Sequence, residues 1–145
     1  MFKHILLPTD GSELSEAAIH KGIQLAKSIN AKVTGFHVIL PFHVFTAQTE
    51  MLEDTKEQYE RQSKLHAEQF LGVIKKAAEK AGVSCDNDSV TSSHPYEMII
   101  EAAEKKGCDL IMMASHGRRG VQGLLIGSET QKVLTHTRIP VLVLR

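Results

Sequence analysis

Short apolar runs alternate with longer amphipathic segments along this chain, and this alternation restricts its fold more than any other feature. Four of the runs are rich in aliphatic and β-branched residues, and they cover His4–Pro8, Ala31–Leu40, Cys108–Ala114 and Val141–Arg145. Continuous apolar runs of this length are typical of strands buried on both faces of a sheet. A fifth run, Val83–Val90, is more polar, which favours a strand at the edge of the sheet.

Helical patterns separate these predicted strands. The first follows Asp10, which we expect to be its N-cap, with Glu13 completing a capping box. Apolar and small residues then recur at helical spacing, and they are Leu14, Ala18, Gly22, Leu25 and Ile29. Two further patterns cover Glu50–Ala81 and the segment from Pro95 to Gly107.

The last helix is predicted to begin at Ser128. Gln131 stands three residues further on, so a second capping box is expected there. Val133 and Leu134 supply the apolar face of this helix. Pro140 then breaks the chain before the final strand.

The order of elements is therefore β-α-β-α-β-α-β-α-β. Such alternation predicts an α/β fold, a single doubly wound Rossmann-like domain over residues 1–145. The domain has a five-stranded parallel sheet with helices on both faces.

Charge and composition exclude several classes of partner. Seventeen basic residues balance seventeen acidic ones, so we expect no nucleic-acid partner, and any anion site must be local. We also expect no membrane partner, because no targeting segment opens the chain and no apolar stretch approaches the ~20 residues that span a bilayer. Cys85 and Cys108 form no CxxC pair, which favours free thiols and a cytoplasmic location.

Two loops are candidates for a ligand site. In doubly wound sheets, ligands bind outside the carboxyl ends of the strands, where the strand order reverses. One candidate loop is Pro8–Ser12, and the other runs from Ala114 to Ser128. Gly117 would let the backbone approach a ligand closely, and Gly127 with Ser128 opens a helix whose amides suit an anion. Arg118 and Arg119 would add local positive charge, and Leu124–Ile126 are expected to anchor the second loop.

Each of these features also has a purely structural explanation. Glycines between a strand and a helix are common in turns and caps, and a serine at a helix start is usually a cap. The chain contains no Walker-type phosphate loop and no GxSxG elbow. Its eight histidines form no Cys/His cluster, so no metal site is predicted. If the glycines were the only evidence, a structural role in turns and caps would explain them better than a ligand site.

Several stretches taken together resemble the universal stress protein family over the whole chain. They occur in the order ILLPTDGS, FHVI, DLIMMASHGRRG, LLIGSETQKVL and IPVLVLR. The ATP-binding branch of that family carries the motif G-x2-G-x9-G-[S/T]. Here the motif reads Ala114-x2-Gly117-x9-Gly127-Ser128.

The resemblance implies an adenine nucleotide, ATP or AMP, with or without Mg²⁺. Asp10 would bond the ribose hydroxyls, and the backbone of Val38 would meet the adenine edge. Amides at Gly127, Ser128 and Glu129, with the Ser128 hydroxyl, would contact the outer phosphates. The implied nucleotide-binding residues are Pro8, Thr9, Asp10, Val38, Ala114, Ser115, His116, Gly117, Arg118, Gly127, Ser128 and Glu129.

Two residues bear on whether this site still works. Ala114 replaces the first glycine of the motif, but it closes an extended strand, so a negative φ and continued binding are expected. The carboxylate of Glu129 would repel phosphates unless it points away or helps to hold a metal ion.

The resemblance implies a nucleotide-dependent sensor or switch of the stress response. It also implies a homodimer that pairs through the final strand, Val141–Arg145. We expect no enzyme, because no general base, acidic metal pair or arginine finger is evident. Two alternatives remain open: a slow ATPase or phosphotransferase with His116 or Ser128 as acceptor, and a nucleotide-free dimeric scaffold.

Overall fold

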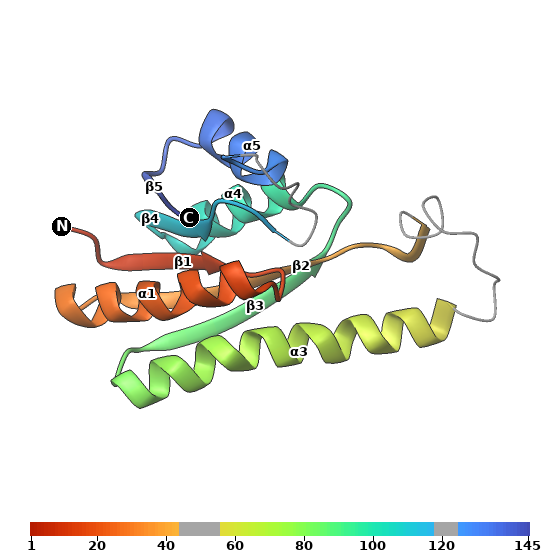
Figure 1. Ribbon diagram of the computed structural model, residues 1–145, viewed down its shortest axis with the longest axis horizontal. Coiled ribbons are helices and arrows are strands. Elements are labelled where there is room, and N and C mark those ends of the chain that lie inside the picture. Colours follow the sequence, from red (N-terminus) through yellow and green to blue (C-terminus); the bar gives the residue numbers. More distant parts are fainter. Residues whose placement is uncertain (44–55, 118–124) are drawn as a thin grey trace.

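The computed structural model describes residues 1–43, 56–117 and 125–145 (Figure 1). Strands and helices alternate in the predicted order, which confirms the α/β fold class. The elements are β1 (His4–Pro8), α1 (Glu13–Ile29), β2 (Lys32–Ile39), α3 (Lys56–Ala81), β3 (Cys85–Thr91), α4 (Pro95–Lys106), β4 (Leu110–Ala114), α5 (Ser128–His136) and β5 (Val141–Leu144).

The five strands form one parallel sheet in the order β3-β2-β1-β4-β5. The polar strand β3 lies at one edge, as its composition predicts, and β5 lies at the other. From β1 the chain builds outward through β2 to β3 and then returns to β4 on the opposite side. The strand order therefore reverses between β1 and β4, and a ligand crevice is expected at their carboxyl ends.

Helices cover both faces of the sheet. Residues of α1 and α3 pack with alternate residues of β1 into one core, which contains Ile5 and Leu7. Residues of α4 and α5 pack on the other face around Leu6 and Phe36. Every residue of β1 and β4 is buried, which explains their continuous apolar sequences.

The start of α1 differs from the prediction. Ser12 is the N-cap, and its hydroxyl accepts a hydrogen bond from the amide of Ser15 at 3.2 Å. The prediction of Asp10 as N-cap is wrong, because a turn at Gly11, with φ +78°, separates Asp10 from the helix. The Asp10 carboxylate instead accepts from the amide of Ser12 at 3.0 Å.

Helix α5 begins at Ser128 as predicted, but its cap differs from the prediction. Gly127 occupies the N-cap and Ser128 is the first helical residue, so the predicted capping box with Gln131 is wrong. Val133 is fully buried, but Leu134 is 40% exposed, because the next residue of a helix points about 100° away. Leu125 is 63% exposed and does not anchor the loop as expected, while Leu124 lies outside the described residues.

Helix α3 extends past the end of the sheet (Figure 1). The predicted start of this helix at Glu50 lies outside the described residues. Leu65, in its first half, is 52% exposed although its pattern predicts an apolar face, whereas Ile74 and Ala78, over the sheet, are fully buried.

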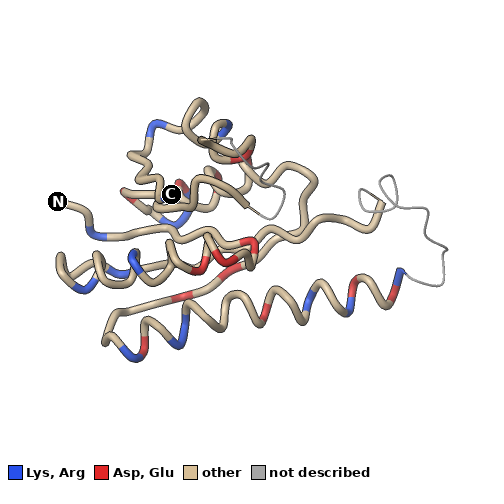
Figure 2. Tube along the Cα trace, viewed as in Figure 1, with Lys and Arg blue, Asp and Glu red and all other residues tan. Residues whose placement is uncertain are grey.

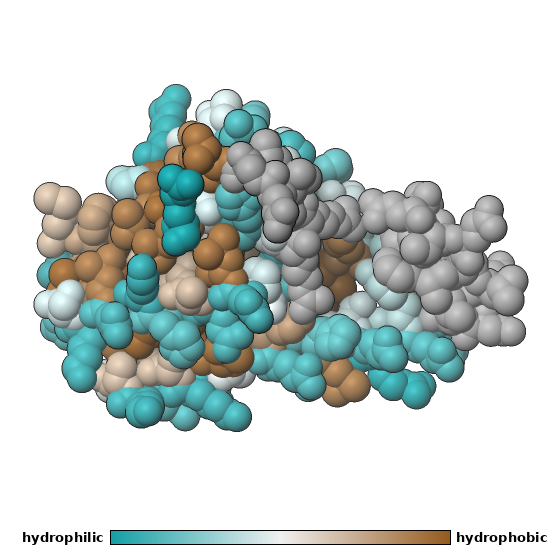
Figure 3. Space-filling model, viewed as in Figure 1, coloured by the Kyte–Doolittle hydropathy of each residue, from teal (hydrophilic) through white to brown (hydrophobic). Residues whose placement is uncertain are grey.

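Charged residues of both signs lie along the helices in the described part of the chain (Figure 2). Figure 2 shows Lys and Arg interspersed with Asp and Glu along α3. Figure 3 shows polar side chains over the outer surfaces of α1 and α3, with hydrophobic ones gathered between α1 and β5. None of the helices in the described ranges is both long and apolar enough to cross a membrane.

Candidate functional site

The loops that follow β1 and β4 meet at the switch point of the sheet. A side-chain carbon placed on Gly117 would overlap Oδ2 of Asp10, so the Asp10 carboxylate lies directly against the Cα of Gly117. Any larger residue at position 117 would therefore have to displace the Asp10 carboxylate. This contact joins the loops that follow β1 and β4, which are the two loops that the sequence indicates as candidates for a ligand site.

The turn that carries Asp10 is held by side chains of its own loop and of α1. The hydroxyl of Thr9 accepts from the amide of Gly11 at 3.1 Å and lies 3.2 Å from the hydroxyl of Ser15. Thr9 is only 7% exposed. Its side chain therefore supports the turn, and its hydroxyl is turned towards α1.

The start of α5 is fastened to the end of β4. The amide of Gly127 donates to the carbonyl oxygen of Ser115 at 2.6 Å, and the hydroxyl of Thr130 donates to the carbonyl oxygen of Ala114 at 2.9 Å. The Gly127 amide thus has a protein acceptor in this structure, and its predicted contact with phosphate stays a prediction. The amides of Ser128 and Glu129 follow in the first turn, where helical geometry supplies no acceptor.

Ala114 fits its position without backbone strain. Among the described non-glycine residues, a positive φ occurs at Asn30 alone, so Ala114 has the negative φ that the sequence predicts. The residue is 6% exposed and ends β4 opposite Leu144. The methyl group that replaces the motif glycine is therefore part of the core.

The carboxylate of Glu129 is engaged with α4. Its Oε2 accepts from the amide of Tyr96, in the first turn of α4, at 3.0 Å. The N-cap residue of that helix, His94, makes no side-chain capping bond, so Glu129 supplies the acceptor instead. A carboxylate is also favourable at the positive end of the α4 dipole. This arrangement removes the reason to expect strong repulsion of phosphate.

Ser115 and His116 continue from β4 into the loop. The hydroxyl of Ser115, which is 1% exposed, lies 2.9 Å from Nδ1 of His116. Nε2 of His116 is buried, and within the described part of the chain it has no hydrogen-bond partner. Buried polar atoms are nearly always paired, so this nitrogen marks a polar position next to the two loops.

The other predicted site residues lie close to these two loops or outside the described part of the chain. Pro8 is the buried last residue of β1. Val38, near the end of β2, packs its side chain into the α4–α5 core, and its predicted contact with the base stays a prediction. Arg118 lies outside the described residues, so its predicted role is not tested here.

Comparison of the sequence and the structure with known proteins identifies the family of this chain. The model of the universal stress protein family matches residues 1–145. The chain belongs to the universal stress protein family. It is 33% identical to universal stress protein MJ0531 of Methanocaldococcus jannaschii over 147 residues, covering 100% of this chain and 83% of that protein.

Solved structures agree with the family. The structure of MJ0577, described as a hypothetical protein in a structural genomics test case, is 31% identical, with a TM-score of 0.79 and coverage of 99% of this chain and 95% of that one. A universal stress protein from Archaeoglobus fulgidus in complex with dAMP has a TM-score of 0.70 at 14% identity, covering 100% of this chain and 98% of that chain. At that identity the second likeness concerns the fold.

Two residues of this universal stress protein's site were missed at the sequence level. Thr130 fastens α5 to β4, and Nδ1–H of His37 donates to the carbonyl oxygen of Thr9 at 2.7 Å. The direction follows because a carbonyl oxygen only accepts. Neither residue stands beside a motif glycine, and both act through contacts distant in sequence, so no local pattern indicates them.

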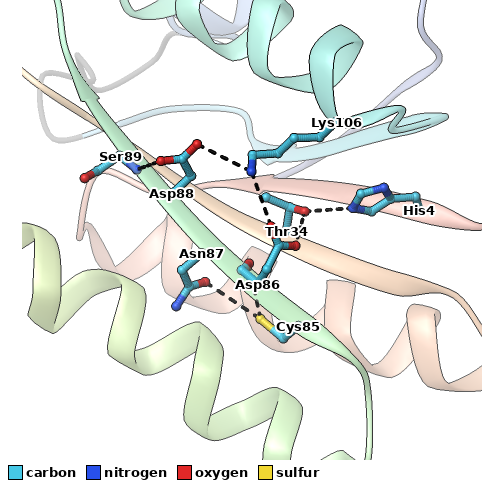
Figure 4. Close-up of polar contacts among 8 residues, drawn as sticks. All are labelled: His4, Thr34, Cys85, Asp86, Asn87, Asp88, Ser89 and Lys106. Atoms are coloured by element: carbon cyan, nitrogen blue, oxygen red, sulfur yellow. Dashed lines mark hydrogen bonds and ion pairs between the residues drawn. The ribbon is translucent and has the colours of Figure 1, made fainter.

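A second polar network lies at the opposite, amino end of the sheet (Figure 4). Nε2 of His4 is 2.7 Å from Oγ1 of Thr34, which is 2.6 Å from Oδ1 of Asp86. Because a carboxylate only accepts, Thr34 donates to Asp86 and its oxygen accepts from His4 Nε2–H. Lys106, at the end of α4, pairs with Asp86 at 3.3 Å and with Asp88 at 3.4 Å.

The network shifts the acidities of its members. Burial, with the Lys32 charge next in size, lowers the pKa of His4 below its usual range, so the folded protein favours the neutral ring. For Asp86, burial opposes ionisation, but the hydrogen bonds from Thr34 and Lys106 outweigh it and lower the pKa. In this family member the network ties the polar edge strand β3 to β1 and α4, and it lies apart from the candidate site.

Proposed function

We propose that this universal stress protein binds an adenine nucleotide at the carboxyl ends of β1 and β4 and acts as a nucleotide-dependent switch or sensor in the stress response. The observation that carries the proposal is the contact between the Asp10 carboxylate and the Cα of Gly117. It brings a hydroxyl-binding acid and a glycine-lined backbone to the switch point. A family member solved in complex with dAMP supports the choice of an adenylate.

Different residues of the site would bind the ribose, the base and the phosphates of a nucleotide. Asp10 would accept from the ribose hydroxyls, and the backbone at Val38 would meet the base. The amides of Ser128 and Glu129, at the positive end of α5, would receive phosphate oxygens. Both ATP and AMP could bind in this way, and Mg²⁺ would be bound together with the phosphates of ATP.

A switch suits the site better than an enzyme. Two side chains near the site already have structural partners, since Glu129 holds α4 and Thr9 holds the Asp10 turn. We expect any ATP hydrolysis to be slow.

The exposed edge of β5 suits a second copy of the chain. Leu142 is 41% exposed on this edge strand, and hydrophobic side chains gather beside it (Figure 3). An apolar edge strand that is left unpaired invites pairing with another strand. We therefore propose a homodimer through β5.

Thermal unfolding with and without Mg-ATP tests the nucleotide site, after any co-purified nucleotide has been removed. ATP at 100 times its dissociation constant stabilises a protein by about 2.7 kcal/mol. For a domain of this size that corresponds to a rise in Tm of about 5–10 °C. AMP and dAMP, measured in parallel, rank the ligands, and phosphate release measured on the same samples detects hydrolysis.

Two aspartate variants provide the control. Asp10→Ala should abolish the rise, because it removes the ribose acceptor. Asp88→Ala, which removes a half-exposed carboxylate from the edge strand β3, should keep it. Equal rises in the two variants, or no rise in the unaltered protein, would contradict the proposal and favour the scaffold. Rapid phosphate release that depends on Asp10 would favour the ATPase.

A further inference from the structure

The long helix α3 is braced against the turn that carries Asp10. Gly11 adopts φ +78°, and a side-chain carbon placed there would overlap the ring of Phe70. The ring therefore packs directly on the backbone of the turn. Because protein interiors are close-packed, a shift of this turn has to displace the ring or be resisted by it.

His37 ties the same turn to the same ring from a third element. Its Nδ1–H donates to the carbonyl oxygen of Thr9, at the residue before Asp10, at 2.7 Å. Its ring meets Phe70 edge to face, with centroids 5.3 Å apart and planes at 76°. Phe70 in turn stacks on His66, one turn earlier in α3, at 5.8 Å. The turn, the end of β2 and the middle of α3 thus share one aromatic contact.

The start of α3 makes a second contact, with the residue that follows β2. The hydroxyl of Tyr59 donates to the carbonyl oxygen of Leu40 at 2.7 Å. Between these elements lies a groove of about 430 Å³ whose lining includes Ile39, Phe42 and Tyr59. The first half of the helix extends past the sheet (Figure 1). Among its described residues, Ala67 is buried and Leu65 is 52% exposed.

We propose that Phe70 and His37 are positioning residues that couple the ligand site to α3, so that occupation of the Asp10 turn changes the stability of the first half of that helix. The proposal rests on the nucleotide binding proposed above. The contacts form a continuous path from Asp10 through Gly11 to Phe70 and His66, and coupling is carried by packed side chains of this kind. The stability of the first half of α3, and of the groove beside it, would then depend on whether a nucleotide occupies the site.

Hydrogen exchange of the full chain, with and without saturating Mg-ATP, tests the coupling, and calorimetry on the same samples measures binding. In the unaltered protein, ATP should slow exchange in peptides covering residues 56–70 by at least about 5-fold, the lower end of ordinary coupling factors. Phe70→Leu should still bind ATP but lose most of this protection. Leu65→Ala, a matched truncation of an exposed side chain on the same helix, should keep it.

A second experiment needs no nucleotide. Gly11→Ala places a methyl group in the Phe70 ring, whereas Gly107→Ala imposes the same kind of backbone strain, at φ +69°, where nothing lies within 4 Å. Gly11→Ala should speed exchange in α3 more than in α4, and Gly107→Ala should not. In the Phe70→Leu background, Gly11→Ala should speed exchange in α3 much less than it does in the unaltered protein, because the overlap is relieved.

The outcomes separate the two proposals. ATP binding by calorimetry without any change in α3 would overturn the coupling and leave nucleotide binding intact. Absence of ATP binding would overturn nucleotide binding, and the Gly11→Ala comparison would then decide the coupling by itself. Equal exchange rates in α3 for the Gly11 and Gly107 variants would refute the coupling whether or not ATP binds.

Discussion

Replacing Thr34 by valine removes the central oxygen of the His4–Thr34–Asp86 network while keeping the shape of the side chain. Thr34 is fully buried and His4 is 6% exposed, so no water can easily replace the missing acceptor. The Nε2–H of His4 would be left without a partner, which costs about 1–3 kcal/mol. Asp86 also loses a donor, but its side chain is 58% exposed and can turn to water.

For a domain of this size, that loss corresponds to a fall in Tm of about 3–10 °C at neutral pH. Thermal unfolding followed by circular dichroism measures it. Thr135→Val is the matched control, because Thr135 is exposed and its hydroxyl bonds only to the carbonyl of Gln131 in its own helix. The control should change stability by less than about 0.5 kcal/mol. Equal Tm values for Thr34→Val and the unaltered protein would refute the donor and acceptor assignment in this network.

The same network predicts the direction of the pH dependence. Since burial lowers the pKa of His4 in the folded state, the unfolded chain binds the proton more readily. Stability is therefore full above the unfolded pKa of about 6.5 and is lost as pH falls below it. The lowered pKa of Asp86 adds a further loss below about pH 4, where the unfolded carboxylate takes up a proton. In His4→Gln the decline just below pH 6.5 should be smaller, and an unchanged decline would show that another group causes it.

Three other changes test the site and the interface. Glu129→Gln should lower stability by about 0.5–2 kcal/mol, as loss of a helix cap does, with little effect on the dissociation constant of ATP; a clear gain in affinity would show that the carboxylate repels phosphate. Ala114→Gly restores the family motif but should lower stability by about 0.5–1 kcal/mol in chemical denaturation without tightening nucleotide binding, and tighter binding would show that the methyl group obstructs the ligand. Leu142→Lys should convert a dimer to a monomer in light scattering, and an unchanged mass would place the interface elsewhere.

Much of the fold can be predicted from the sequence, because burial and backbone geometry act within a few residues of the chain. The buried runs at β1 and β4, the polar run at β3 and the glycine that ends α4 each reflect burial or backbone geometry within a few residues. The start of α1 was less predictable. At α1 both Asp10 and Ser12 are good capping residues, and the turn at Gly11, packed on Phe70 of α3, separates the first of them from the helix.

The sequence by itself determined that this is a parallel α/β protein of the universal stress family, with its glycine motif between the fourth strand and the last helix. Tertiary structure alone decided what the motif residues do. The Cα of Gly117 lies against the Asp10 carboxylate, the amide of Gly127 donates to Ser115, and Glu129 caps a neighbouring helix. The physical reason is the sequence separation of the contacting residues. Periodicity reports how each segment packs against the core. These contacts, in contrast, form only when the strand order has brought distant loops to one end of the sheet.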